Sequence, residues 1–115
     1  MYSCKCSIEC GTWIGALADA AKIALRTSLK VLRVLGLGLR VPHSFQIRTS
    51  LMAGLRALEF KAERYTYRAY YPYIEAENKF LIIMGYVLPS VGFGAFQSEI
   101  IPDVKRIYDT VLGTA

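Results

Sequence analysis

Cysteine and histidine are scarce in this sequence, and their scarcity limits its chemistry. The three cysteines all lie in the opening CKCSIEC, at Cys4, Cys6 and Cys10. Three thiols cannot close a set of disulfides, so a disulfide-stapled secreted module is excluded. His43 is the only histidine, and with the cysteines it matches poorly the paired ligand spacing of a zinc site. We therefore expect no metal site, with free thiols or contacts in a larger assembly as the roles left to the cysteines.

Sequence motifs of catalysis are also missing. No Ser-His-Asp set, phosphate-binding loop or dinucleotide-binding motif is present, and the glycine-rich GLGLR follows a predicted helix and lacks the required context. Glu75 and Glu77 are two positions apart, so their carboxylates would diverge on a helix and could not share acid and base work. These absences predict that the protein is not an enzyme, has no cofactor and has no small-molecule substrate.

Acidic residues are missing between residues 20 and 58, although the 115-residue chain carries nine of them against 14 Lys or Arg. The first half is therefore basic, whereas residues 59–79 are balanced and the remainder is slightly acidic. Lys5, Glu9 and Asp19 interrupt the opening segment, which excludes a secretory signal there. An arginine-rich, acid-poor amphipathic segment near an N-terminus is typical of mitochondrial import signals, and we expect this one to be kept as structure.

The spacing of residues 12–35 predicts a basic amphipathic helix. Its apolar residues, among them Leu25 and Leu32, line one side, and the basic residues share a separate arc of about 80°. The basic residues are Lys22, Arg26, Lys30 and Arg33. Gly36 and Gly38 would end the helix. We expect the cations to contact lipid headgroups of an anionic leaflet, and a solvated basic face packed on protein is the alternative.

One long uncharged run occupies the second half. It covers 19 residues, 80–98, between Lys79 and Glu99. A helix of this length spans about 28 Å, close to the hydrocarbon thickness of a bilayer. The interior Pro89 disfavours a buried helix of a water-soluble domain but is tolerated in membrane helices. The run therefore predicts one kinked transmembrane helix over residues 73–98.

Small or shape-breaking residues would share one face of this helix, within about 60° of one another. They are Gly85, Pro89, Gly92 and Phe96. We expect them to form a groove in which a partner helix sits, because small residues let backbones approach closely in a membrane. Simple accommodation of the kink is the alternative.

A tyrosine cluster precedes the uncharged run, in YTYRAYYPY. Its members are Tyr65, Tyr67, Tyr70, Tyr71 and Tyr73. Tyrosine collects at the membrane interface, where one end of the side chain is in apolar surroundings and the other is hydrated. The cluster therefore predicts a membrane boundary, and stacking in a protein interface or against bases is the alternative.

These patterns together predict an all-α protein with no independent globular core. Residues 1–49 would be the basic amphipathic segment, 50–72 a second amphipathic helix with the tyrosine cluster, 73–98 the transmembrane helix and 99–115 a short C-terminal helix. That last helix would open at Pro102 and stop at Gly113. The basic excess of the first half predicts an N-terminus in the mitochondrial matrix and a C-terminus in the intermembrane space.

The segment GFGAFQSEIIPDVKRIYD resembles the end of the smallest single-span subunits of the cytochrome bc1 complex. In that family a Gly and a Phe close the span and an Ile-Tyr-Asp follows. The corresponding residues are Gly92, Phe96, Ile107, Tyr108 and Asp109. The basic Gly-Lys-Trp ending of the family is missing from this chain. More broadly, the predicted features are similar to those of supernumerary subunits of mitochondrial inner-membrane complexes, which brace a catalytic core, seal lipid and assist assembly.

This resemblance implies a non-catalytic accessory subunit of a respiratory-chain complex or the ATP synthase, in the mitochondrial inner membrane. The expected partners are the other subunits of that complex and anionic lipid such as cardiolipin, with no nucleic acid. A soluble helical nucleic-acid-binding protein, such as a mitochondrial ribosomal subunit, is the alternative from another class. A subunit of a protein translocase or a membrane-shaping complex would have the same sequence features.

Overall fold

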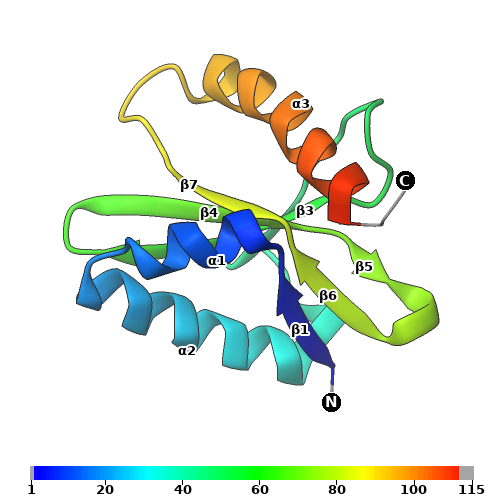
Figure 1. The fold of residues 1–115 in the computed structure, drawn as a ribbon. Coiled ribbons are helices and arrows are strands. Elements are labelled where there is room, and N and C mark those ends of the chain that lie inside the picture. Colours follow the sequence, from blue (N-terminus) through cyan, green and yellow to red (C-terminus); the bar gives the residue numbers. More distant parts are fainter. Residues whose placement is uncertain (1, 112–115) are drawn as a thin grey trace.

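The structure is a computed structural model that describes residues 2–111, and it is a mixed α/β fold (Figure 1). The first half contains β1 (Ser3–Cys6), α1 (Ile8–Gly15), α2 (Asp19–Leu35), the 3-10 helix η1 (Gly36–Gly38) and β2 (Ser44–Gln46). The second half contains β3 (Arg56–Ala62), β4 (Tyr65–Tyr71), β5 (Tyr73–Ile74), the 3-10 helix η2 (Glu75–Glu77), β6 (Lys79–Ile82), β7 (Met84–Val87) and α3 (Phe93–Val111).

Two sheets share the middle of the fold. Strands β2, β3, β4 and β7 form an antiparallel sheet in that order, and β1, β6 and β5 form the other, in which β1 runs parallel to β6. The chain passes from β4 to β5 at Pro72 and from β6 to β7 at Ile83, so the same two chain segments contribute to both sheets. Where they meet, the N–H of Ile83 donates to the carbonyl of Tyr70 at 2.9 Å.

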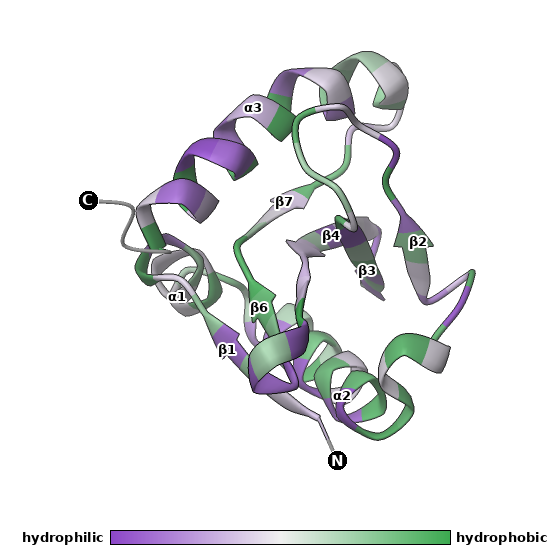
Figure 2. Cartoon of the chain, turned by 90° about the vertical axis from the view of Figure 1, so that its right-hand side faces the viewer, coloured by the Kyte–Doolittle hydropathy of each residue, from purple (hydrophilic) through white to green (hydrophobic). Residues whose placement is uncertain are grey.

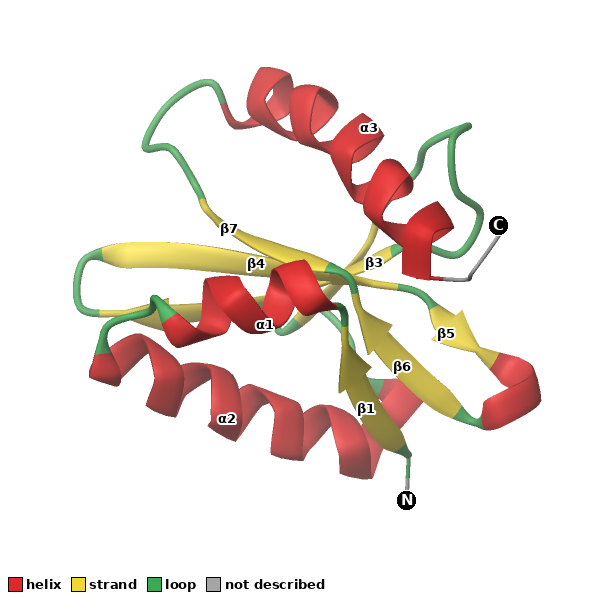
Figure 3. Cartoon of the chain, viewed as in Figure 1, coloured by secondary structure: helices red, strands yellow, loops and turns green. Residues whose placement is uncertain are grey.

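The helices lie on opposite sides of the strands, with α1 and α2 on one side and α3 on the other (Figure 1, Figure 3). Each side has its own hydrophobic cluster, and β6 supplies both. Phe80 and Ile82 belong to the cluster under α1 and α2, whereas Leu81 and Ile83 belong to the cluster under α3. Figure 2 shows the hydrophobic ribbon of β6 inside the fold. Successive strand residues point to opposite faces, and a strand covered on both sides is therefore apolar on both, which explains the run from Phe80 in β6 to Ile83 just after it.

The predicted transmembrane helix over residues 73–98 is wrong. These residues form β5, η2, β6, β7, a loop that contains Pro89 and the first turns of α3. No helix within residues 2–111 has both the length and the apolar character needed to cross a bilayer. A continuous apolar run on a strand buried on both faces cannot be told from a buried helix by periodicity. The all-α class without a globular core is wrong for the same reason.

The predicted helix over residues 50–72 is also wrong. A loop comes first, and β3 then pairs with β4 in register, from Arg56 opposite Tyr71 to Ala62 opposite Tyr65. Aromatic and β-branched residues favour strands, and YTYRAYY is built mainly of them.

The predicted placement of the N-terminus in the matrix and the C-terminus in the intermembrane space depended on the transmembrane helix. That placement stays a prediction.

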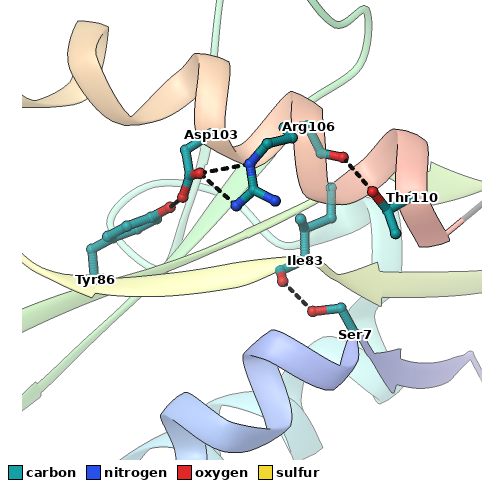
Figure 4. Close-up of polar contacts among 6 residues, drawn as sticks. All are labelled: Ser7, Ile83, Tyr86, Asp103, Arg106 and Thr110. Atoms are coloured by element: carbon teal, nitrogen blue, oxygen red, sulfur yellow. Dashed lines mark hydrogen bonds and ion pairs between the residues drawn. The ribbon is translucent and has the colours of Figure 1, made fainter.

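The C-terminal helix is longer than predicted. Helix α3 begins at Phe93, and Pro102 lies inside it. It is tied to β7 by the Tyr86 hydroxyl, which donates to Asp103 at 3.0 Å, and Asp103 in turn accepts from Arg106 at 2.7 Å (Figure 4). The predicted stop at Gly113 lies outside the described residues.

The predicted basic helix over residues 12–35 is divided between α1 and α2. Ser7 caps the start of α1, because its Oγ accepts a hydrogen bond from the N–H of Cys10 at 2.9 Å. The same hydroxyl donates to the carbonyl of Ile83 at 2.5 Å (Figure 4). One buried hydroxyl thus both caps the helix and fastens it to the junction of β6 and β7. Helix α2 ends at Leu35, and Gly36 follows with a φ of 55°, which favours glycine.

Candidate functional site

The ion pairs among the described residues all lie in the second half of the chain. They join Glu59 to Arg68, Glu77 to Lys79, Asp103 to Arg106 and Asp109 to Lys105, with N–O distances between 2.6 and 3.0 Å. Within residues 2–58, no Lys or Arg takes part in one. The positive charge of the first half is therefore not paired with a carboxylate of residues 2–111, and such a surface attracts external anions.

Helix α2 carries four of these unneutralised cations. Its buried residues are Ala21, Leu25 and Leu32, which pack under the helix. The cations, Lys22, Arg26, Lys30 and Arg33, lie on the adjoining flank, where only Lys22 is partly buried. At about 100° per residue they form one strip along the helix. Arg26, Lys30 and Arg33 are exposed, and α2 lies at the outside of the fold (Figure 1).

Exposed aliphatic residues border this basic strip. Ile23 is 61% exposed and Val34 is 65% exposed, and they lie within about 20° of each other beside Lys30. Val31 and Leu35 are exposed on the same helix. Single exposed aliphatic residues are ordinary on protein surfaces, but a group beside a basic strip is typical of helices that lie in a membrane interface. We call Lys22, Arg26, Lys30 and Arg33 with Ile23 and Val34 the outer face of α2.

The apolar side of the basic helix, which the sequence led us to place in lipid, is part of the protein core. Ala21, Leu25 and Leu32 belong to the cluster with Phe60 and Tyr67 from the sheet. These leucines therefore cannot enter a bilayer while the protein is folded. The aliphatic residues left for such a contact are those of the outer face, and the lipid role of the four cations stays a prediction.

The tyrosine cluster is spread across the sheet and mostly buried. Tyr67 stacks on Phe60 with ring centroids 5.0 Å apart, and the Tyr71 hydroxyl shares a 2.6 Å hydrogen bond with Ser44. Burial raises the pKa of Tyr70 to about 12, and its hydroxyl donates to Gln97 at 2.8 Å. Of the five tyrosines, only Tyr65 is exposed and Tyr73 is half-buried. Tyr67, Tyr70 and Tyr71 thus pack inside the protein and do not stand at a membrane boundary.

The four residues of the predicted helix groove do not share a helix. Gly85 is in β7, Pro89 is in the following loop, Gly92 precedes α3 with a φ of 71°, and Phe96 is in α3. Gly85 does allow a close approach, but by the Trp13 ring of α1 and not by a partner helix. Phe96 packs edge-on against Tyr86 in the cluster under α3.

The cysteines are free thiols in three different surroundings. Cys6 is exposed, Cys4 is half-buried and Cys10 is fully buried. Burial, with a smaller contribution from neighbouring Cys6, raises the pKa of Cys10 to about 12, so this thiol is a poor nucleophile at neutral pH. His43 is exposed, and its backbone joins Arg40 and Glu59 by hydrogen bonds. Within residues 2–111 no group of three His, Cys, Asp or Glu is placed to hold a metal ion.

A polar cluster that the sequence did not predict lies beneath the start of α3. Arg68 is 8% exposed, and its guanidinium lies between the rings of Phe45 and Phe93, 4.2 and 4.5 Å from their centroids. It also pairs with Glu59 at 3.0 Å and donates to Gln97 at 3.2 Å. The cross-strand position of Glu59 opposite Arg68 is the only signal in the sequence, and it becomes visible only once the register of β3 and β4 is known. The cluster is structural, since every polar group is paired within the protein.

The fold and its charge distribution thus describe an α/β protein with one basic, partly aliphatic helix face. Comparisons with protein-family models, with curated proteins and with solved structures found no match. Functional inference therefore rests on the geometry of the surface.

Proposed function

We propose that the protein is a non-catalytic accessory subunit of a mitochondrial inner-membrane complex, either a respiratory-chain complex or the ATP synthase, and that it lies on the membrane surface. Its contact is the outer face of α2, which meets anionic lipid such as cardiolipin. The observation that supports this most is one helix face that combines the exposed Ile23 and Val34 with four cations that make no ion pair within the described part of the chain.

The two parts of the outer face would act together at a lipid surface. Each Lys or Arg near an anionic leaflet contributes about 1 kcal/mol, and this attraction is screened by salt. Aliphatic side chains at the level of the headgroups add a contribution that salt does not screen. Because neither part alone holds a protein firmly, the proposed contact is peripheral and reversible, and neighbouring subunits of the complex would strengthen it.

A nucleic-acid-binding subunit, such as a ribosomal one, is the competing function, because the same cations could meet phosphates. Single-stranded nucleic acids are also held by stacking of bases on aromatic side chains. Tyr67, Tyr70 and Tyr71 are buried, and the residues exposed beside the cations are aliphatic. The outer face therefore favours lipid over bases.

Co-sedimentation with vesicles tests the proposal. Wild-type protein should bind vesicles of phosphatidylcholine with cardiolipin and should not bind phosphatidylcholine alone. Replacing Lys22, Arg26, Lys30 and Arg33 by Gln should abolish binding. The variant Ile23→Ser, Val34→Ser should keep a weaker binding that disappears at high salt.

The matched control is Lys61→Gln with Arg64→Gln, two exposed cations near the end of β3 and in the turn to β4. It should bind nearly as well as wild type, since these residues lie outside the outer face. Unchanged binding of the fourfold α2 variant would contradict the proposal. So would a preference for RNA over cardiolipin vesicles at physiological salt.

A further inference from the structure

A hollow of about 540 Å³ opens between η1, the loop after β2 and the start of β3. Arg48 and Arg56 line it, and none of the acidic residues that the structure describes does. A second hollow of about 270 Å³ shares Gln46 and Arg56 with the first and adds Arg40. We call the larger space, with Arg48 and Arg56 in its wall, the arginine hollow. Three arginines therefore line two neighbouring spaces, and no carboxylate of residues 2–111 lines either.

Arg56 is the best placed of these cations. It is half-buried at the start of β3, it makes no ion pair with any of residues 2–111, and it lines both spaces. Burial raises the pKa of the neighbouring Tyr71, while hydrogen bonds with Ser44 and Arg56 and the positive charge of Arg56 lower it. The Arg56 guanidinium thus has a neutral hydrogen-bond partner, and an anion in the hollow would offset the cost of its partial desolvation.

The floor and walls of the arginine hollow are ordered by contacts within the protein. Ile47, Met52 and Leu55 are buried in the cluster under α3 and form an apolar floor. The N–H of Ile47 donates to the carbonyl of Leu55 at 2.9 Å, which closes the base of the loop. Tyr73 also lines the hollow; its ring packs against Phe80 with centroids 5.1 Å apart, and its hydroxyl donates to Asn78 at 2.7 Å. A preformed hollow lined by buried apolar residues, one tyrosine and two cations suits a small ligand with an anionic group.

We propose that the arginine hollow binds a phosphate-bearing small molecule of nucleotide size, with Arg48 and Arg56 on the phosphate and Tyr73 against the organic part. One guanidinium group can donate two parallel hydrogen bonds to a phosphate, and an aromatic ring can stack on a planar organic group. The volume lies within the range of about 300–1,000 Å³ that holds small ligands. This site is separate from the outer face of α2, so it does not depend on the proposed membrane contact.

Calorimetric titration of the full chain with ADP, and separately with inorganic pyrophosphate, tests this site. Arg56→Gln and Arg48→Gln should each weaken ADP binding by about tenfold or more, as expected for loss of a charge-assisted hydrogen bond. Tyr73→Leu should weaken ADP binding and leave pyrophosphate binding unchanged. The control Lys5→Gln removes one exposed cation of β1 that does not line the arginine hollow, and it should bind both ligands as wild type does. Arg48 is exposed, so its variant is informative even if Arg56→Gln unfolds the protein.

Equal affinities of wild type, Arg48→Gln and Lys5→Gln for ADP would overturn the proposal, and so would no binding of ADP at all. A third arm distinguishes a lipid phosphate from a free one. If Arg48→Gln lost binding to cardiolipin vesicles while ADP failed to compete with them, the phosphate would be that of a lipid headgroup and the small-molecule site would be wrong. The fourfold α2 variant should bind ADP normally, which separates failure of this site from failure of the membrane proposal.

Discussion

Gly85 of β7 lies directly under the indole ring of Trp13 from α1, so closely that a methyl group at position 85 would overlap the ring carbons. The contact joins the first helix to one of the last strands of the sheet. It also explains why a glycine stands in an otherwise bulky run, since only a residue without a side chain admits the ring there.

Gly85→Ala should therefore destabilise the protein by about 1–3 kcal/mol, because Trp13 has to leave its place or β7 has to shift. Urea unfolding followed by circular dichroism measures this difference. Gly94→Ala is the control, because nothing lies within 4 Å of a methyl group there and the residue is helical. It should leave the free energy of unfolding unchanged or raise it by up to about 1 kcal/mol. Equal effects of the two substitutions would contradict the described packing.

Arg68→Lys should destabilise the protein although it keeps the positive charge. A lysine cannot lie flat between Phe45 and Phe93 and cannot reach Glu59 and Gln97 together, so we expect a loss of about 1–3 kcal/mol in the free energy of unfolding. Arg64→Lys, at an exposed arginine over the ring of Tyr65, should change it by less than about 0.5 kcal/mol.

The double variant Glu59→Gln, Arg68→Met separates the ion pair from the packing around it. Replacing both partners leaves no uncompensated charge, so the double variant should be more stable than Arg68→Met alone. Thermal unfolding of wild type, the two single variants and the double variant gives the coupling free energy between Glu59 and Arg68. Additive losses would show that Glu59 and Arg68 do not interact.

The acid limb of the stability curve should depend on Asp103. Its hydrogen bond from Arg106, and after that its bond from Tyr86, lower its pKa in the folded protein. A carboxyl with a lowered pKa stabilises the fold above its unfolded pKa of about 3.9, and this stabilisation is lost as the pH falls through that value and below. Asp103→Asn should therefore be less stable than wild type at pH 7 and should approach it near pH 2. The difference will be small, since the side chain is 46% exposed.

Urea midpoints between pH 2 and pH 7 measure this dependence. Tyr86→Phe removes the hydrogen bond from Tyr86 and keeps the Arg106 pair, so its curve should lie between those of wild type and Asp103→Asn. Parallel curves for wild type and Asp103→Asn would contradict the assigned role of this carboxyl.

The end of α2 could be predicted from the sequence, whereas the strands could not. The 3.6-residue spacing and Gly36 are local signals, and they place the end of the helix at Leu35. No local pattern marks β6 as a strand. Phe80 and Ile82 are buried in one hydrophobic cluster, and Leu81 and the following Ile83 are buried in the other, so the run shows no alternation of apolar and polar residues. The apolar run that predicted a transmembrane helix therefore belongs to a strand that is covered by helices on both sides.

The candidate site shows the same limit. The four cations of α2 were visible as an acid-free basic arc, but which aliphatic residues stay exposed depends on how the helix docks. The helical spacing places Leu25 on the apolar side, where it is buried, but it does not show that Ile23 and Val34 stay exposed beside the cations. The arginine hollow could not be predicted for the same reason, since Arg48 and Arg56 line one space in the fold in which the N–H of Ile47 bonds to Leu55.

The central proposal is that the outer face of α2 lies on anionic lipid, and NMR with cardiolipin vesicles that carry a spin label on a lipid headgroup tests it most directly. The amide signals of Ile23, Lys30 and Val34 should broaden strongly, while that of Arg106, on α3 at the opposite side of the strands, should not. Broadening centred on α3, or none on α2 at lipid concentrations where the protein is bound, would contradict it.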